Sequence, residues 1–218
     1  MTDNDKNIGA GQFSDEFRAG LLDLMHWRRD VRHFRRDPVP QQILDDCLAT
    51  FSLAPSVGLS QPWRLVQIKS DAARQGALKN FQHANAEALK GYEGEKASLY
   101  AGLKLTGMQD APVQIAVFCD EATEQGAGLG AQSMPEMRRY SVVSAIMQFW
   151  LAARAHGLGL GWVSILDAPA LCQTLEVPQD WALVAYLCIG WPQDDKEQPE
   201  LEQLGWEYRR ELPPLETR

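Results

Sequence analysis

The sequence is poor in cysteine, and its few cysteines form no pattern that would hold a metal or a redox dithiol. The four residues are far apart, with no C-x-x-C pair and no histidine pair nearby: Cys47, Cys119, Cys172 and Cys188. Zinc sites and redox dithiols both depend on such spacing, so we predict no metal site and four reduced thiols. Reduced thiols favour a cytoplasmic location.

Long apolar runs and an excess of positive charge are also absent. No segment is long enough to cross a bilayer, and residues 1–13 are polar, without the apolar stretch of a signal peptide. The chain has 21 Lys and Arg against 29 Asp and Glu, a net charge of -8. Nucleic acids and anionic membranes bind surfaces rich in Lys and Arg, so we expect neither as a partner. A local basic pocket is compatible with this charge.

Several motifs of nucleotide and acyl-transfer chemistry are missing. There is no G-x-x-x-x-G-K-[ST] and no G-x-S-x-G. The run from Gly157 to Trp162 resembles a dinucleotide fingerprint, but a helix precedes it, a strand follows it, and Trp162 stands where that motif needs glycine. The four histidines are scattered, which predicts neither a metal site nor a catalytic triad.

What the sequence does contain is an alternation of helices and short strands within one domain, residues 1–218. Its 45% hydrophobic content suffices for one core, and no repeat or linker interrupts it. We predict helices at 14–27, 40–54, 71–109 (broken near Gly91 and Gly94), 137–156 and 168–175, and strands at 64–68, 113–119, 160–166 and 182–191. The core would span 14–193, with a movable lid near 85–110 and an extended tail at 194–218. A solvated helical hairpin is an equal alternative to the lid.

The helix predicted at 137–156 is apolar on nearly every side. Such a helix has to be buried on every side. In a chain of this size it is therefore either the central helix of the domain or part of a large homodimer interface.

Two polar segments near the start of the chain point to a cofactor site. Residues 28–32 place three arginines around Asp30, and arginine forks suit a phosphate or the electron-rich edge of a ring. An acid there weakens anion binding, so Asp30 is better suited to chemistry than to binding. The second segment, residues 54–63, is a turn-rich loop whose Ser56, Ser60 and Gln61 can grip a planar polar ring.

These segments carry a family resemblance. The order RRDVRHF, APSVGLSQPW, LKLTGMQDAP, LAARAHGLGLGWVSI and WALVAYLCIGWP resembles the 5,6-dimethylbenzimidazole synthases, the flavin-destroying branch of the nitroreductase-like superfamily. The resemblance implies an α+β, nitroreductase-like fold with a central mixed sheet flanked by helices, in an intertwined homodimer with FMN at the subunit interface. It also implies that reduced FMN and O2 are consumed, and that a separate flavin reductase supplies the reduced FMN.

The resemblance further implies the roles of individual residues. Asp30 and Ser164 would be the catalytic pair, with Asp30 as the base that takes a proton from the ribityl C1′ carbon while its arginine neighbours keep it ionised. Other residues would contact FMN: Arg28, Arg29, Val31, Arg32, Ser56, Gln61, Lys104, Leu105 and, from the tail, Arg209 or Arg210.

Two other functions remain open at this point. The runner-up is a conventional FMN-dependent NAD(P)H nitroreductase or quinone reductase, which would recycle its flavin. The third is a flavin-storing binding protein without turnover. Whether the flavin is consumed, recycled or merely retained distinguishes the three.

Overall fold

Four antiparallel strands form the sheet at the centre of the computed structural model, which describes residues 12–103 and 106–218. In sheet order they are β1 (Trp63–Gln67), β2 (Val113–Asp120), β4 (Trp181–Gly190) and β3 (Gly159–Val163). We expected a mixed sheet, whereas these four strands pair only antiparallel. Among the described residues, the parallel component is one isolated bridge between Asp30 and Leu160, because the chain runs alongside β3 only at that point.

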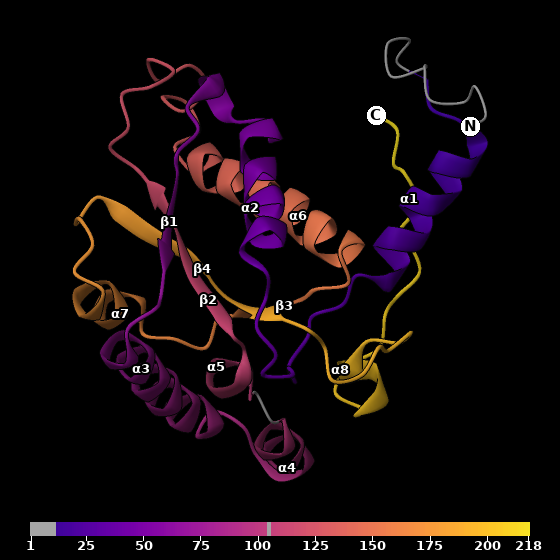
Figure 1. The fold of residues 1–218 in the computed structure, drawn as a ribbon, viewed down its shortest axis with the longest axis vertical. Coiled ribbons are helices and arrows are strands. Elements are labelled where there is room, and N and C mark those ends of the chain that lie inside the picture. The colour runs from indigo at the N-terminus through magenta and orange to yellow at the C-terminus, as the bar shows by residue number, and fades with distance from the viewer. Residues whose placement is uncertain (1–11, 104–105) are drawn as a thin grey trace.

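Helices cover both faces of this sheet (Figure 1). Side chains of β2 and β4 alternate between the faces, so that Val117 and Leu187 enter one core cluster while Phe118 and Tyr186 enter the other. The first cluster lies under α2 (Gln41–Ala49), η1 (Thr50–Leu53) and α6 (Met137–Ala155). The second lies against α3 (Asp71–Leu89), α5 (Gly107–Asp110) and α7 (Ala168–Thr174). The expected α+β architecture is therefore confirmed.

Local signals set several element ends as predicted. The Ser14 hydroxyl accepts the Phe17 N–H at 3.2 Å and starts α1 (Asp15–Trp27). The predicted break near Gly91 and Gly94 separates α3 from α4 (Gly94–Gly102), and Gly94 has φ 57°.

The structure differs from the predictions most clearly at the end of β3 and in the tail. β3 ends at Val163 and not at residue 166, because Asp167 caps α7 by accepting the Ala170 N–H at 3.0 Å. In the tail, α8 (Glu200–Gln203) forms one helical turn where we expected only extended chain. No helix in the described ranges is long and apolar enough to cross a membrane.

α6 is not buried on every side within one chain. Its face toward the sheet is buried, but Tyr140, Val143 and Met147 are exposed on the opposite face. The neighbouring helix α1 has no buried residue and projects from the body, with Phe17 and Leu22 exposed (Figure 1). A single chain thus leaves these apolar faces uncovered.

Candidate functional site

The segment of residues 28–32, which we call the arginine segment, follows α1 and lies directly against β3. The Val31 N–H donates to the Leu160 carbonyl at 2.8 Å. This approach depends on glycine, because a Cβ atom on Gly161 would lie 2.2 Å from the Val31 carbonyl oxygen, and one on Gly159 would lie 2.7 Å from the Val31 side chain. The glycine run that resembles a dinucleotide fingerprint is therefore a seat for the arginine segment.

That seat fixes the carboxylate of Asp30. Its Oδ1 accepts the backbone N–H of Trp162 at 3.0 Å, and its Oδ2 lies 3.5 Å from Nε of Arg32. Although 42% of the side chain is accessible, the surrounding protein displaces enough water to raise the pKa of Asp30, against the opposing effects of the Trp162 N–H, Arg32 and Arg28. The arginines act in the expected direction, since they favour the ionised form of Asp30, but loss of water has the larger effect on its pKa. A raised pKa makes Asp30 a stronger base.

A basic cavity adjoins Asp30. We call it the arginine pocket; it encloses about 590 Å³, part of it open to solvent, and its basic lining residues are Arg28, Arg29, Arg32 and Arg209. Two buried nitrogens, Nε of Arg29 and Nη1 of Arg32, have no hydrogen-bond partner among the described residues. Burial lowers the pKa of Arg29, and so do the charges of Arg209 and Arg28. Unpaired donors among repelling cations suit an anion, although the carboxylates of Asp30 and Glu200 also line this cavity.

An adjoining cavity, of about 510 Å³, extends from the arginine segment toward the end of α6. Trp27 and Trp150 line it, and the Arg28 guanidinium lies 4.8 Å from the Trp150 ring centroid. Trp162 packs on Trp150 with ring centroids 6.4 Å apart. Aromatic walls beside a cationic pocket suit a planar ligand that carries a negative group.

The second predicted segment lies elsewhere. Ser56 accepts the Gln61 N–H at 3.1 Å, and the Val57 N–H at the start of η2 (Val57–Leu59) donates to Ser141, near the beginning of α6, at 3.0 Å. The arginine segment contacts Trp150, nine residues further along the helix, which corresponds to about 14 Å of helix axis. One chain therefore does not bring the two segments together.

The loop that carries Ser56 nevertheless has a conformation typical of functional sites. Gln61 and Leu59 have φ of 42° and 57°, in the left-handed region that residues with a side chain rarely adopt. Gln61 is thus held in an uncommon conformation that its surroundings must stabilise.

The remaining predicted residues have different outcomes. Ser164 directly follows β3, two residues after Trp162; it is exposed, and its hydroxyl has no hydrogen bond among the described residues. Arg209 reaches the arginine pocket, whereas Arg210 is exposed and does not line it. Lys104 and Leu105 lie outside the described residues.

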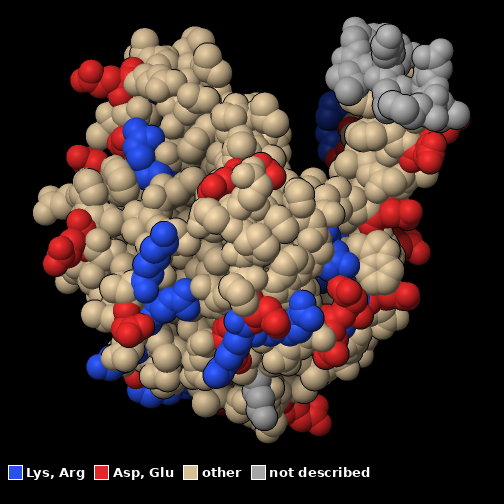
Figure 2. Space-filling view, viewed as in Figure 1, with Lys and Arg blue, Asp and Glu red and all other residues tan. Residues whose placement is uncertain are grey.

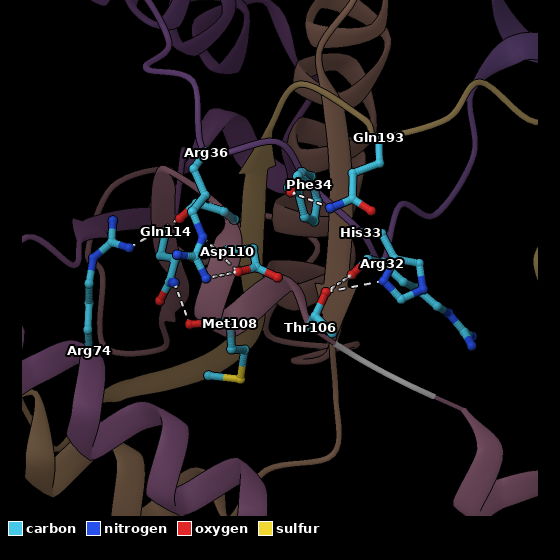
Figure 3. A network of polar contacts seen from close by, with 11 residues as sticks. Arg32, His33, Phe34, Arg36, Arg74, Thr106, Met108, Asp110, Gln114 and Gln193 are labelled. Carbon is cyan, nitrogen blue, oxygen red and sulfur yellow. Dashed lines mark hydrogen bonds and ion pairs between the residues drawn. The ribbon is translucent and has the colours of Figure 1, made fainter.

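A polar network that the sequence did not reveal holds α5 beside the arginine segment (Figure 3). His33 Nδ1 lies 3.1 Å from the Thr106 hydroxyl, and Arg36 pairs with Asp110 at 2.6 Å. Gln114 is fully buried, donates to the Met108 carbonyl at 2.8 Å and accepts the Tyr186 hydroxyl at 2.6 Å. The only sequence signal was the presence of polar residues within predicted core strands.

Comparisons with known proteins agree with this geometry. A sequence model of the Nitroreductase family matches residues 25–191. The chain is 55% identical over 201 residues to a 5,6-dimethylbenzimidazole synthase from Rhodospirillum rubrum, covering 92% of this chain and 95% of that protein. It is 46% identical to one from Rhodobacter capsulatus, covering 89% and 94%. A crystal structure of iodotyrosine deiodinase bound to FMN and 3-iodo-L-tyrosine shares the fold, with a TM-score of 0.73, 21% identity, and coverage of 91% and 98%.

Proposed function

The chain belongs to the nitroreductase family, and from that premise we propose that it is a 5,6-dimethylbenzimidazole synthase that consumes reduced FMN. Its similarity to two synthases over about nine tenths of the chain supports the activity. The observation that carries the proposal is the position of Asp30, held on β3 at the edge of the arginine pocket.

The residues of the site fit FMN. The orphaned nitrogens of Arg29 and Arg32 would bind its phosphate together with Arg28 and Arg209, and the cavity beside Trp150 would accept part of its ring system. Each charge-assisted hydrogen bond to the phosphate contributes about 1.5–3 kcal/mol. Val31, which lines the cavity beside Trp150, would contact the flavin.

Reduced FMN would supply both the electrons that activate O2 and the ribityl carbon that enters the product, leaving erythrose 4-phosphate. Asp30 takes the proton from that carbon, C1′. Oδ1 accepts the Trp162 N–H at 3.0 Å, whereas Oδ2 lies 3.5 Å from Arg32 Nε, so Oδ2 is the less tightly engaged oxygen and the better acceptor for the proton. Ser164, at the end of the same strand, has a free hydroxyl among the described residues and orients either Asp30 or the reacting oxygen.

The active form is a homodimer. Three features support this: the exposed apolar faces of α1 and α6, the family's FMN site at a subunit interface, and the separation of Ser56 and Gln61 from the arginine segment. A second copy that covers α6 would bring its own Ser56 loop toward the first copy's flavin. Lys104 and Leu105 fall within the proposed lid, residues 85–110, and would contact FMN.

The proposal also covers the source of the reduced FMN and the location of the protein. A separate flavin reductase supplies reduced FMN, because this chain is proposed to consume its flavin and not to recycle it. The protein works in the cytoplasm, where its four free thiols stay reduced. On the face drawn in Figure 2, basic and acidic side chains are interspersed, which suits a small-molecule enzyme better than a nucleic-acid-binding surface.

A single-turnover experiment tests the function. The protein is loaded with reduced FMN without oxygen, O2 is then admitted, and the products are identified by mass spectrometry. We expect dimethylbenzimidazole and erythrose 4-phosphate in amounts that match the flavin lost. FMN recovered intact in its oxidised form would instead indicate a reductase, and reduced FMN that stays bound and unreacted would indicate a binding protein.

A further inference from the structure

The tail of the chain packs onto the α3–α4 hairpin through a cluster of aromatic rings. Tyr92 stacks on Tyr100 with ring centroids 4.7 Å apart, and Trp206 meets the edge of Tyr92 at 5.5 Å. Lys96 on α4 holds its Nζ 4.5 Å from the Trp206 ring centroid and also donates to the Trp206 carbonyl. We call these four residues the aromatic clamp. It joins α4, which lies within the proposed lid, to a tail segment about 110 residues away in the sequence.

Arg209 of the arginine pocket comes soon after Trp206 of the aromatic clamp in the sequence. The Trp206 N–H donates to the Leu201 carbonyl at 2.9 Å, and Gly205, with φ 70°, allows the chain to reverse there. Glu202 then accepts both the backbone N–H of Arg209 at 2.7 Å and its Nε at 3.0 Å. Arg209 thus follows Trp206 by three positions and is bonded back to α8 through Glu202.

Arg209 needs such an anchor. Its side chain is 62% exposed, and it approaches three other arginines, whose mutual repulsion is visible in the lowered pKa of Arg29. α8 has only four residues and no buried side chain, so the short helix alone cannot fix the tail. Polar contacts hold the tail to the body before α8, such as the bond from Arg29 to the Glu197 carbonyl, and after α8 Trp206 packs on Tyr92, Tyr100 and Lys96.

We infer that Trp206 is a positioning residue that holds Arg209 in the arginine pocket only while α4 is docked, so that docking of the lid and capture of the phosphate are one coupled event. The inference rests on the proposed function, which assigns the pocket to the FMN phosphate. The four residues of the aromatic clamp join the tail to α4. Glu202 bonds the Arg209 side chain, so the turn that follows α8 also fixes the position of Arg209.

The test compares FMN with riboflavin, which has the same ring system but no phosphate. We expect W206A to weaken FMN binding by about ten- to a hundredfold, the effect of losing one charge-assisted hydrogen bond, while riboflavin binding stays unchanged. R209A should show the same selective loss, and the double variant should lose no more than either single variant. W206F, which keeps an aromatic ring, should restore most of the FMN affinity.

The control is Y208A, which removes an exposed aromatic side chain from the same tail segment and should bind FMN like the parent. Hydrogen exchange of the α4 amides gives a second readout: it should rise in W206A and stay unchanged in R209A. Equal losses of FMN and riboflavin in W206A, or additive losses in the double variant, would overturn the coupling. A parent protein that does not distinguish FMN from riboflavin would instead refute the phosphate pocket itself.

Discussion

The substitution G161A tests whether the catalytic geometry depends on the glycine seat under the arginine segment. The new Cβ would lie 2.2 Å from the Val31 carbonyl oxygen, which would have to move by about 0.8 Å to reach a 3.0 Å contact. This movement strains two hydrogen bonds, from Val31 N–H to Leu160 at 2.8 Å and from Trp162 N–H to Asp30 at 3.0 Å. Overpacking of this kind costs about 1–3 kcal/mol of stability.

The catalytic effect of G161A should exceed its structural effect. A displacement of about 1 Å at a catalytic group lowers a rate by roughly 10²-fold, so dimethylbenzimidazole formation in a single turnover should fall by about that factor. G159A meets the Val31 side chain and not its backbone, so a smaller loss is expected, and G20A, with no atom within 4 Å, is the control. Urea unfolding measures the stability of each variant. A folded G161A that forms product at the parent rate would refute the glycine seat.

Three further predictions concern the pocket, the interface and the carboxylate. R29A should weaken FMN binding by about 1.5–3 kcal/mol without changing riboflavin binding, as measured by fluorescence titration; an unchanged FMN affinity would remove Arg29 from the phosphate site. M147E places a charge on the exposed apolar face of α6 and should convert a dimer into monomers in sedimentation, whereas a parent already monomeric at micromolar concentration would contradict the interface. Burial raises the pKa of Asp30 in the folded protein above its value in the unfolded chain, which is about 4. The folded state therefore binds the proton more tightly, and the parent protein should lose stability relative to D30N as the pH rises from about 4 through the folded-state pKa. Urea unfolding between pH 4 and 7 measures this difference, and a constant difference would show that folding does not perturb Asp30.

The sequence allowed most elements to be predicted because their signals are local. The Ser14 cap, the break at Gly94 and the apolar pattern of α6 each depend on residues within a few positions of one another. The arginine segment was likewise recognisable as an anion site from its composition alone.

What could not be predicted depends on distant contacts. The purpose of Gly161 becomes clear only when the arginine segment lies against β3, since the clash involves the Val31 carbonyl, 130 positions earlier. Arg209 and Arg210 are adjacent in sequence, and the bond to Glu202 decides which one enters the pocket. The pKa of Asp30 depends on how much water the packing removes and on how close the arginines lie, and no sequence motif encodes either of these.

The central claim is that Asp30 directs the bound flavin toward fragmentation. The most direct measurement is product analysis of D30N loaded with reduced FMN and exposed to O2, beside the parent protein. D30N keeps the size and the Oδ1 acceptor of Asp30 but cannot take up a proton at neutral pH. We predict retained FMN binding, continued oxidation of the reduced flavin, and a fall in dimethylbenzimidazole of roughly two orders of magnitude or more. Dimethylbenzimidazole formed by D30N at near the parent rate would contradict the account.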